Sequence, residues 1–245
     1  MENFKLAIIA GHGGKDSGAF ANGVDERDIN LVVAKEMERI LCDYCDVIMT
    51  RTDNDTFLTP EQCANIANNS GADLAWHVHH NAGGGDGFDI IHSVFIESSE
   101  SDELAKLLAI KYKELGQNEH GVYSKWNSSY NENYYAALRH SEITALISEF
   151  AFMDSLDFEA IDSEYKLKQE AKASAETIIE FYGLQKEIPM TWQEILIGCL
   201  DSPEEAIKFV DTNTEIAKLK SDLGDLDYKN LSDLIIKVYN YGKEQ

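Results

Sequence analysis

Several residues with metal-ligand chemistry stand at the predicted ends of strands and at the start of a helix. His12 follows the first apolar run of the chain, and His77, His79 and His80 cluster at the end of another. Glu26 precedes a helical pattern, where a carboxylate is favoured. Two imidazoles and one carboxylate leave a zinc coordination position open, which is typical of a hydrolytic rather than a structural site. Spacing alone leaves an alternative open, in which these are a loop histidine, a strand histidine facing the core and a solvated glutamate.

The histidine cluster has a geometry that a strand would dictate. Alternate side chains of a strand share a face, so His77 and His79 point one way and His80 the other, unless the strand has already ended. One or two of these imidazoles can therefore reach a common site. Asn81 follows them, either as a ligand-binding or His79-orienting residue or as a turn former.

Hydrophobic periodicity predicts the elements that position these residues. Strands are expected over residues 5–10, 46–50, 73–79, 88–97 and 144–150, and helices over 29–41, from Thr59 onward, over 102–115 and over 165–182. Their alternation predicts an α/β fold with a sheet covered on both faces.

The pattern changes after Leu184. A polar stretch with a proline, residues 185–190, predicts a linker, and only helical signals follow. We therefore expect a domain over residues 1–184 and a small all-helical C-terminal domain over 191–245. So few large apolar residues make that second domain marginal, so we expect it to need a partner surface, such as a second copy of the chain in a homo-oligomer.

Composition excludes several classes of function. The 21 basic and 44 acidic residues sum to −23, which disfavours nucleic acid and anionic membranes as partners. The sequence shows no signal peptide and no apolar stretch of membrane-spanning length, so we expect a cytoplasmic protein with reduced cysteines. Cys42 and Cys45 form a C-x-x-C pair without a second pair, which favours two reduced thiols over a metal or redox site.

Ordered blocks along the chain resemble the zinc-dependent N-acetylmuramoyl-L-alanine amidases of the amidase-3 type. The resemblance covers about residues 6–184. Its blocks are GHGG at 11–14, DSGA at 16–19, GVDE at 23–26, NLVVA at 30–34, TRTD at 50–53, ANIAN at 64–68 with GADL at 71–74, the His79-x-Asn81-Ala82 segment and ALISEFAF at 145–152.

The resemblance implies a role for four residues. His12, Glu26 and His79 would hold one Zn²⁺ per catalytic domain, and Glu149 would be the catalytic carboxylate. It also implies a twisted mixed sheet flanked by helices. The alternative for Glu149 is a structural ion pair with Arg139 or a lysine.

Two departures from the family pattern stand out. The family usually has Ser-Ile-His-Ala-Asn where this chain has His77-Val78-His79-His80-Asn81, so His77 and His80 are extra imidazoles. An arginine common in the family at about Gln62 or Cys63 is absent, which leaves the metal ligands intact.

The implied function is hydrolysis of the amide that joins N-acetylmuramic acid to L-alanine in bacterial peptidoglycan. Without an export signal the chain resembles a bacteriophage endolysin, which waits in the host cytoplasm before release to the cell wall. The alternatives are a spore or cell-wall amidase of the host, a zinc peptidase, and a non-enzymatic wall-binding protein. A wall polymer is the expected ligand of the C-terminal domain.

Other polar and aromatic residues have two interpretations each. Arg139 and His140 are either contacts for a substrate carboxylate or an exposed pair, and His92 and His120 are expected to be surface or core histidines. An aromatic stretch forms either the rim of a glycopeptide cleft or a loop packed by its own rings; it contains Tyr123, Trp126, Tyr130, Tyr134 and Tyr135.

Overall fold

A mixed six-stranded sheet forms the centre of the fold. The computed structural model describes residues 3–95, 98–129 and 131–186. The strands occur in the order β4 (Asp46–Met49), β1 (Lys5–Ala10), β5 (Leu74–Asn81), β10 (Thr144–Phe152), β6 (Phe88–His92) and β7 (Glu119–Ser124). The first four are parallel, whereas β6 runs antiparallel to β10 and parallel to β7. The predicted α/β fold with a mixed sheet is confirmed.

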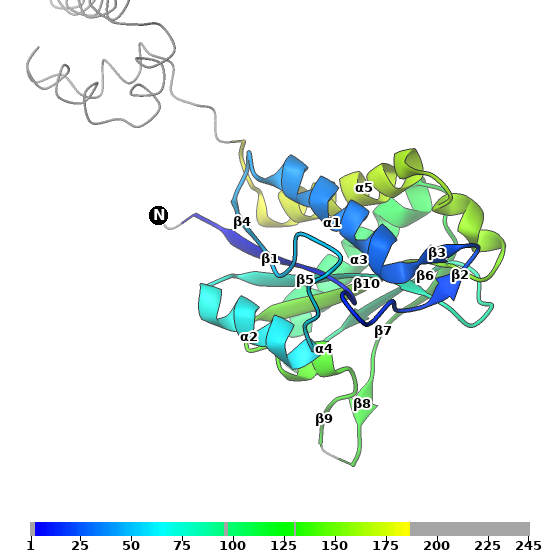
Figure 1. Ribbon diagram of the computed structural model, residues 1–245. Coiled ribbons are helices and arrows are strands. Elements are labelled where there is room, and N and C mark those ends of the chain that lie inside the picture. Colours follow the sequence, from blue (N-terminus) through cyan, green and yellow to red (C-terminus); the bar gives the residue numbers. More distant parts are fainter. Residues whose placement is uncertain (1–2, 96–97, 130, 187–245) are drawn as a thin grey trace, which may run out of the picture. The chain divides into compact units, whose positions relative to one another are not determined.

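Helices cover both faces of this sheet (Figure 1). One face carries α1 (Glu26–Leu41), α3 (Ser98–Glu114) and α5 (Glu164–Tyr182), and the other carries α2 (Pro60–Ser70) and the short α4 (Ala136–Arg139). The central strands are therefore covered on both faces, which explains why the sequence shows near-continuous apolar runs at β1 and β10.

The two faces differ in the size of their core side chains. Leu6, Ile8 and Trp76 belong to the large apolar cluster that also contains residues of α1, α3 and α5. Ala7 and Ala75 belong to a smaller cluster with residues of α2 and α4. The strand alternation that separates the clusters also places His80 on the side of Trp76, and His77 and His79 on the side of Ala75.

Local signals set the ends of the helices. Thr59 caps α2 in a capping box with Gln62, Pro60 is the first helical residue, and Gly71 ends the helix in the left-handed conformation. Glu26 and Asp28 place acidic side chains in the first turn of α1, where the helix dipole favours them.

Smaller elements connect the main ones. The pairs β2 (Phe20–Ala21) with β3 (Val24–Asp25), and β8 (Trp126–Asn127) with β9 (Glu132–Asn133), form two short hairpins, and a 3₁₀ helix spans Leu156–Ala160. The strand predicted over 88–97 ends at His92, and α3 begins earlier than predicted.

The structure places limits on two further predictions. Within the described residues, none of the helices combines the length and apolarity needed to cross a membrane. Apart from the first two residues of the linker, the predicted linker over 185–190 and helical domain over 191–245 lie outside the described residues, so both stay predictions.

Candidate metal centre

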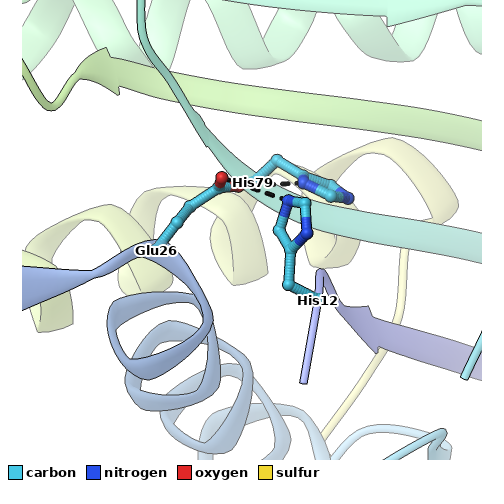
Figure 2. Close-up of side chains that lie close together, drawn as sticks. All are labelled: His12, Glu26 and His79. Atoms are coloured by element: carbon cyan, nitrogen blue, oxygen red, sulfur yellow. Dashed lines mark hydrogen bonds and ion pairs between the residues drawn. The ribbon is translucent and has the colours of Figure 1, made fainter. Parts of the chain in front are cut away.

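His12, Glu26 and His79 point toward one another (Figure 2). His12 follows the end of β1, Glu26 is the first residue of α1, and His79 lies near the end of β5. Glu26 Oε2 lies 3.1 Å from His12 Nε2, and Glu26 Oε1 lies 3.0 Å from His79 Nδ1. One ligand atom from each residue lies within 4.8 Å of the others. Three residues that are distant along the chain thus form one cluster.

The turn after β1 packs tightly against these side chains. A Cβ on Gly11 would lie 2.2 Å from the His79 ring, and a Cβ on Gly18 would lie 2.5 Å from Glu26 Oε2. The backbone N–H of Ala19 donates to the same Glu26 oxygen at 3.0 Å. His12 itself has a positive φ of 62°, a conformation that a non-glycine residue keeps only where its surroundings enforce it.

The hydrogen-bond chemistry of His12 indicates that a cation belongs between the ligands. Asp16 Oδ2 lies 2.9 Å from His12 Nδ1, so that nitrogen donates its N–H to the carboxylate. In a neutral imidazole the other nitrogen, Nε2, then presents a lone pair to a Glu26 oxygen, which also only accepts. Two acceptors at this distance need a proton or a metal ion between them. Two ligands on a tetrahedral zinc, with bonds of about 2.0–2.1 Å, lie about 3.3 Å apart, so the separation of His12 Nε2 and Glu26 Oε2 suits this ion.

Without a metal, protons take its place. Burial opposes a charged His12 ring, but the carboxylates of Glu26 and Asp16 outweigh it and raise the pKa of His12 to about 9. Burial also opposes ionisation of Glu26, yet hydrogen bonds from His12 and His79 hold its pKa well below the usual range. The cluster therefore holds an anionic carboxylate against at least one cation at neutral pH.

Glu149 lies beside this cluster on the same face of the sheet. It is the register partner of His79 on β5 and of Asp89 on β6. Burial raises the pKa of Glu149 to about 7; the charges of Glu26 and Asp89 add to this rise, and His79 opposes it. A carboxylate with this pKa can both accept and donate a proton near neutral pH.

The alternative role for Glu149, a structural ion pair with Arg139 or a lysine, has no support among the described residues. Arg139 Nε lies 3.4 Å from Glu132, and its Nη1 donates to backbone carbonyls of Asn133 and Tyr134. Among the residues that the structure describes, no lysine or arginine pairs with Glu149.

A family model described as N-acetylmuramoyl-L-alanine amidase matches residues 6–180. The chain belongs to this family. The resemblance stated from the sequence blocks is thereby confirmed.

Named relatives include both phage and bacterial members of the amidase family. An endolysin of Bacillus phage SPP1 is 35% identical over 186 residues, which cover 74% of this chain and 66% of the relative. A sporulation-specific N-acetylmuramoyl-L-alanine amidase of Bacillus subtilis is 26% identical and covers 79% of this chain and 74% of the relative. The chain thus spans just under two thirds of the length of the phage relative.

Solved structures share the fold of this chain. The catalytic domain of CwlV, an N-acetylmuramoyl-L-alanine amidase from Bacillus (Paenibacillus) polymyxa, has a TM-score of 0.65 and 23% identity, covering 74% of this chain and 99% of that one. Cwp6 from Clostridium difficile has a TM-score of 0.69 and 23% identity, covering 73% of this chain and 29% of that one.

Three residues without a predicted role support the candidate ligands. Asp16 orients His12, and Asn30 donates to Glu26 Oε1 at 3.1 Å. The buried guanidinium of Arg51 donates to the carbonyls of Ala10 and Gly11 at 2.9 Å each, which fixes the backbone just before His12. The sequence blocks contain Asp16, Asn30 and Arg51, but their contacts depend on the tertiary fold.

The extra histidines have different surroundings. His77 lies outside the cluster; burial lowers its pKa to about 3, and its Nε2 has no hydrogen-bond partner among the described residues. His80 faces the opposite side of the sheet, where it contacts Asn30 and Glu170. The strand runs on to Asn81, so the predicted alternation of these side chains is confirmed.

Asn81 and His120 both act on Asp89. Asn81 Nδ2 donates to Asp89 Oδ2 at 2.8 Å, and His120 Nδ1 lies 2.9 Å from Asp89 Oδ1. Asn81 therefore holds the carboxylate next to Glu149 rather than orienting His79. His120 is partly exposed and paired with that carboxylate, and His92 lies 3.5 Å from Asp102.

The aromatic stretch makes contacts within itself and with neighbouring residues. The hydroxyls of Tyr123 and Tyr135 lie 3.2 Å apart. Trp126 packs edge-on against Phe95, and the ammonium group of Lys125 lies over the Tyr134 ring. Tyr130 lies outside the described residues. These contacts fit both the packed loop and the cleft rim, so the rim stays a hypothesis.

Proposed function

We propose that this protein hydrolyses the amide between N-acetylmuramic acid and L-alanine in bacterial peptidoglycan. The observation that carries the proposal is the convergence of His12, Glu26 and His79 beside Glu149, in a chain of the N-acetylmuramoyl-L-alanine amidase family. Bacterial relatives named N-acetylmuramoyl-L-alanine amidases support the choice of substrate.

The three clustered side chains would hold one Zn²⁺. Two imidazoles and one carboxylate match the donor set of catalytic zinc, which leaves a position open. When bound, zinc lowers the pKa of water and polarises a carbonyl oxygen. Asp16 keeps His12 in the tautomer that a ligand needs, because it accepts the N–H of the other ring nitrogen.

Glu149 would transfer protons during the reaction. Amide hydrolysis needs a base for the attacking water and an acid for the departing amine, which is a poor leaving group. A carboxylate with a pKa raised to about 7 serves both steps, since it takes up a proton and gives it away at the same pH. Asp89 and Glu26 help to hold the proton on Glu149 through their charge.

We further propose that the protein lyses host cells for a bacteriophage. The support is the 35% identity to a phage endolysin, against 26% to a sporulation-specific amidase. On this proposal the protein stays in the host cytoplasm before release to the wall, and residues 191–245 bind a wall polymer or self-associate. A host spore or cell-wall amidase is the second candidate, which the bacterial relatives support.

Digestion of purified cell wall tests the activity. We expect free L-alanine amino termini with intact glycan strands, and complete loss of release in the presence of a zinc chelator. New carboxyl termini inside the stem peptide would instead identify a peptidase. A protein that binds walls without releasing any fragment, and that contains no zinc, would revive the non-enzymatic alternative.

Substitution of Glu149 tests its role separately from the metal. Glu149→Gln removes the acid–base group, so we expect a rate lowered by about 10²–10⁴-fold with zinc content unchanged. Glu142→Gln, at an exposed glutamate just before the same strand, is the matched control and should keep the full rate. A near wild-type rate in Glu149→Gln would reject the assignment.

A further inference from the structure

A histidine–glutamate pair lies completely buried on the far side of the sheet from His79. His80 of β5 and Glu170 of α5 are both 0% exposed, and His80 Nε2 lies 3.0 Å from Glu170 Oε2. The other oxygen of Glu170 is buried without a hydrogen-bond partner among the described residues. The mechanism proposed above does not use this pair, and alanine is usual at the position of His80 in the amidase pattern that the sequence resembles.

The hydrogen bonds of Asn30 determine which atoms donate in this region. Its amide nitrogen lies 3.2 Å from the carbonyl of Gly11 and 3.1 Å from Glu26 Oε1, two groups that only accept. Asn30 Oδ1 must therefore face the other way, where His80 Nδ1 lies at 2.7 Å. His80 must donate there, so its Nδ1 carries a hydrogen.

Glu170 completes this arrangement at the opposite ring nitrogen. Because His80 Nδ1 carries a hydrogen, the contact between His80 Nε2 and the carboxylate of Glu170 needs one shared proton. That proton can reside on the imidazole or on the carboxylate. The pair is then net neutral and internally hydrogen-bonded, which is how a wholly buried histidine and glutamate coexist.

These contacts form a continuous chain that ends on a metal ligand. Glu170 orients His80, His80 orients the amide of Asn30, and Asn30 donates to Glu26 Oε1. The backbone N–H of His80 donates to the same Glu26 oxygen at 3.2 Å. If the Asn30 amide reversed, its oxygen would face the Glu26 carboxylate, and the two would repel each other.

We propose that His80 and Glu170 are positioning residues that hold the Glu26 carboxylate in the orientation required for metal binding. The inference rests on the proposed function, because it concerns the ligand set of the proposed zinc. A purely stabilising role explains the pair less well, since apolar replacements of a buried ion pair are often neutral or stabilising. Outer hydrogen bonds to metal ligands, in contrast, commonly change metal affinity by about 10–100-fold.

The test is the zinc dissociation constant of the full-length protein, measured by competition with a chromophoric chelator. We expect Glu170→Ala to bind zinc about 10–100-fold more weakly than wild type. Glu170→Gln should bind within about threefold of wild type, because its amide N–H can donate to His80 Nε2 and preserve the chain. Glu170→Leu, which fills the volume, replaces Glu170→Ala if the smaller side chain prevents folding.

Thr177→Val is the matched control on the same helix. Thr177 is buried and its hydroxyl donates to the backbone carbonyl of Ala173, away from this chain of contacts. Its substitution is expected to lower the melting temperature of the zinc-free protein without changing zinc affinity.

Failure of this inference can be distinguished from failure of the proposed function. Unchanged affinity in the alanine or leucine variant overturns the inference while the proposed function stands, and so does a glutamine variant as weak as the alanine variant. A wild-type protein that binds no zinc overturns the proposed function itself.

Discussion

The pKa of Glu149, and hence its ability to act as a base, depends on its surroundings. On an exposed surface a glutamate is fully ionised at neutral pH, but burial and the nearby carboxylates Asp89 and Glu26 raise its pKa to about 7. A bound cation acts in the opposite direction, because it favours the ionised form. The base is active only when deprotonated, so activity must rise with pH through the pKa of this group.

We therefore predict an acid limb in the pH profile that belongs to Glu149. For the zinc-loaded protein, kcat/KM on a soluble muropeptide should increase with pH, with a midpoint at or below about pH 7. The residual rate of Glu149→Gln should lack this limb. A rate that falls as pH rises from 5 to 7 would contradict the role of Glu149 as a base.

His12 provides a second pH prediction, for the zinc-free protein. Its pKa is raised from 6.5 to about 9, so its stabilising charge is fully present below pH 6.5 and is lost as pH rises through 9. We expect the melting temperature in chelator to fall over this interval more steeply in wild type than in His12→Gln. Zinc should remove most of the difference, because it replaces the proton. Equal slopes for the two zinc-free proteins would show that His12 does not hold the raised pKa.

At the scale of elements, the segment between β1 and α1 decides whether the candidate ligands His12 and Glu26 meet. Its glycines with positive φ include Gly18 at 66° and Gly23 at 83°. A Cβ on Gly18 would lie 2.6 Å from a His12 ring carbon and closer still to Glu26, whereas a Cβ on Gly23 meets no atom within 4 Å. An alanine would be strained by the positive φ at both positions, but only at Gly18 would its methyl group also collide with site residues.

This difference yields a matched pair of variants. Gly18→Ala and Gly23→Ala should each lose about 1 kcal/mol of unfolding free energy from the unfavourable φ. Only Gly18→Ala should also lose zinc binding, because its methyl group displaces His12 and Glu26. Calorimetry of zinc binding beside thermal unfolding separates the two effects. Equal zinc affinity in both variants would show that the turn does not shape the site.

The elements that the sequence predicted well are those with strong local signals. The apolar runs at β1 and β10 and the Thr59-Pro60 start of α2 depend on burial and capping within a few residues. The edge strand β7 was missed, because its residues are half-buried or exposed and show no alternation. Strand β6 was predicted too long, since the described residues after His92, 93–95, continue the apolar run without being paired in the sheet.

The site was predictable only in part, for the same physical reason. The ligand residues stand at strand and helix ends, which made them candidates, but their convergence follows from strand order, and the choice among the histidines came from the family resemblance. The contacts of Asn30 with His80, and of His80 with Glu170, join residues 50 and 90 positions apart. No local pattern marks such pairs.

At the scale of the whole molecule, the net charge of −23 opposes approach to an anionic wall. We predict that raising salt from about 20 mM to about 150 mM increases the rate on walls that retain teichoic acid, because screening shortens the range of repulsion. Walls stripped of teichoic acid serve as the control and should show a weaker dependence. A rate that falls with salt only on intact walls would indicate electrostatic attraction instead.

The central claim is that His12, Glu26 and His79 together hold one metal ion. Its most direct test is the zinc content of the purified, zinc-equilibrated protein, determined by mass spectrometry of the metal for wild type, His79→Gln and His92→Gln. We predict one zinc per chain in wild type and in the His92 control, and far less than one in His79→Gln. A full equivalent of zinc in His79→Gln, or none in wild type, would contradict the account.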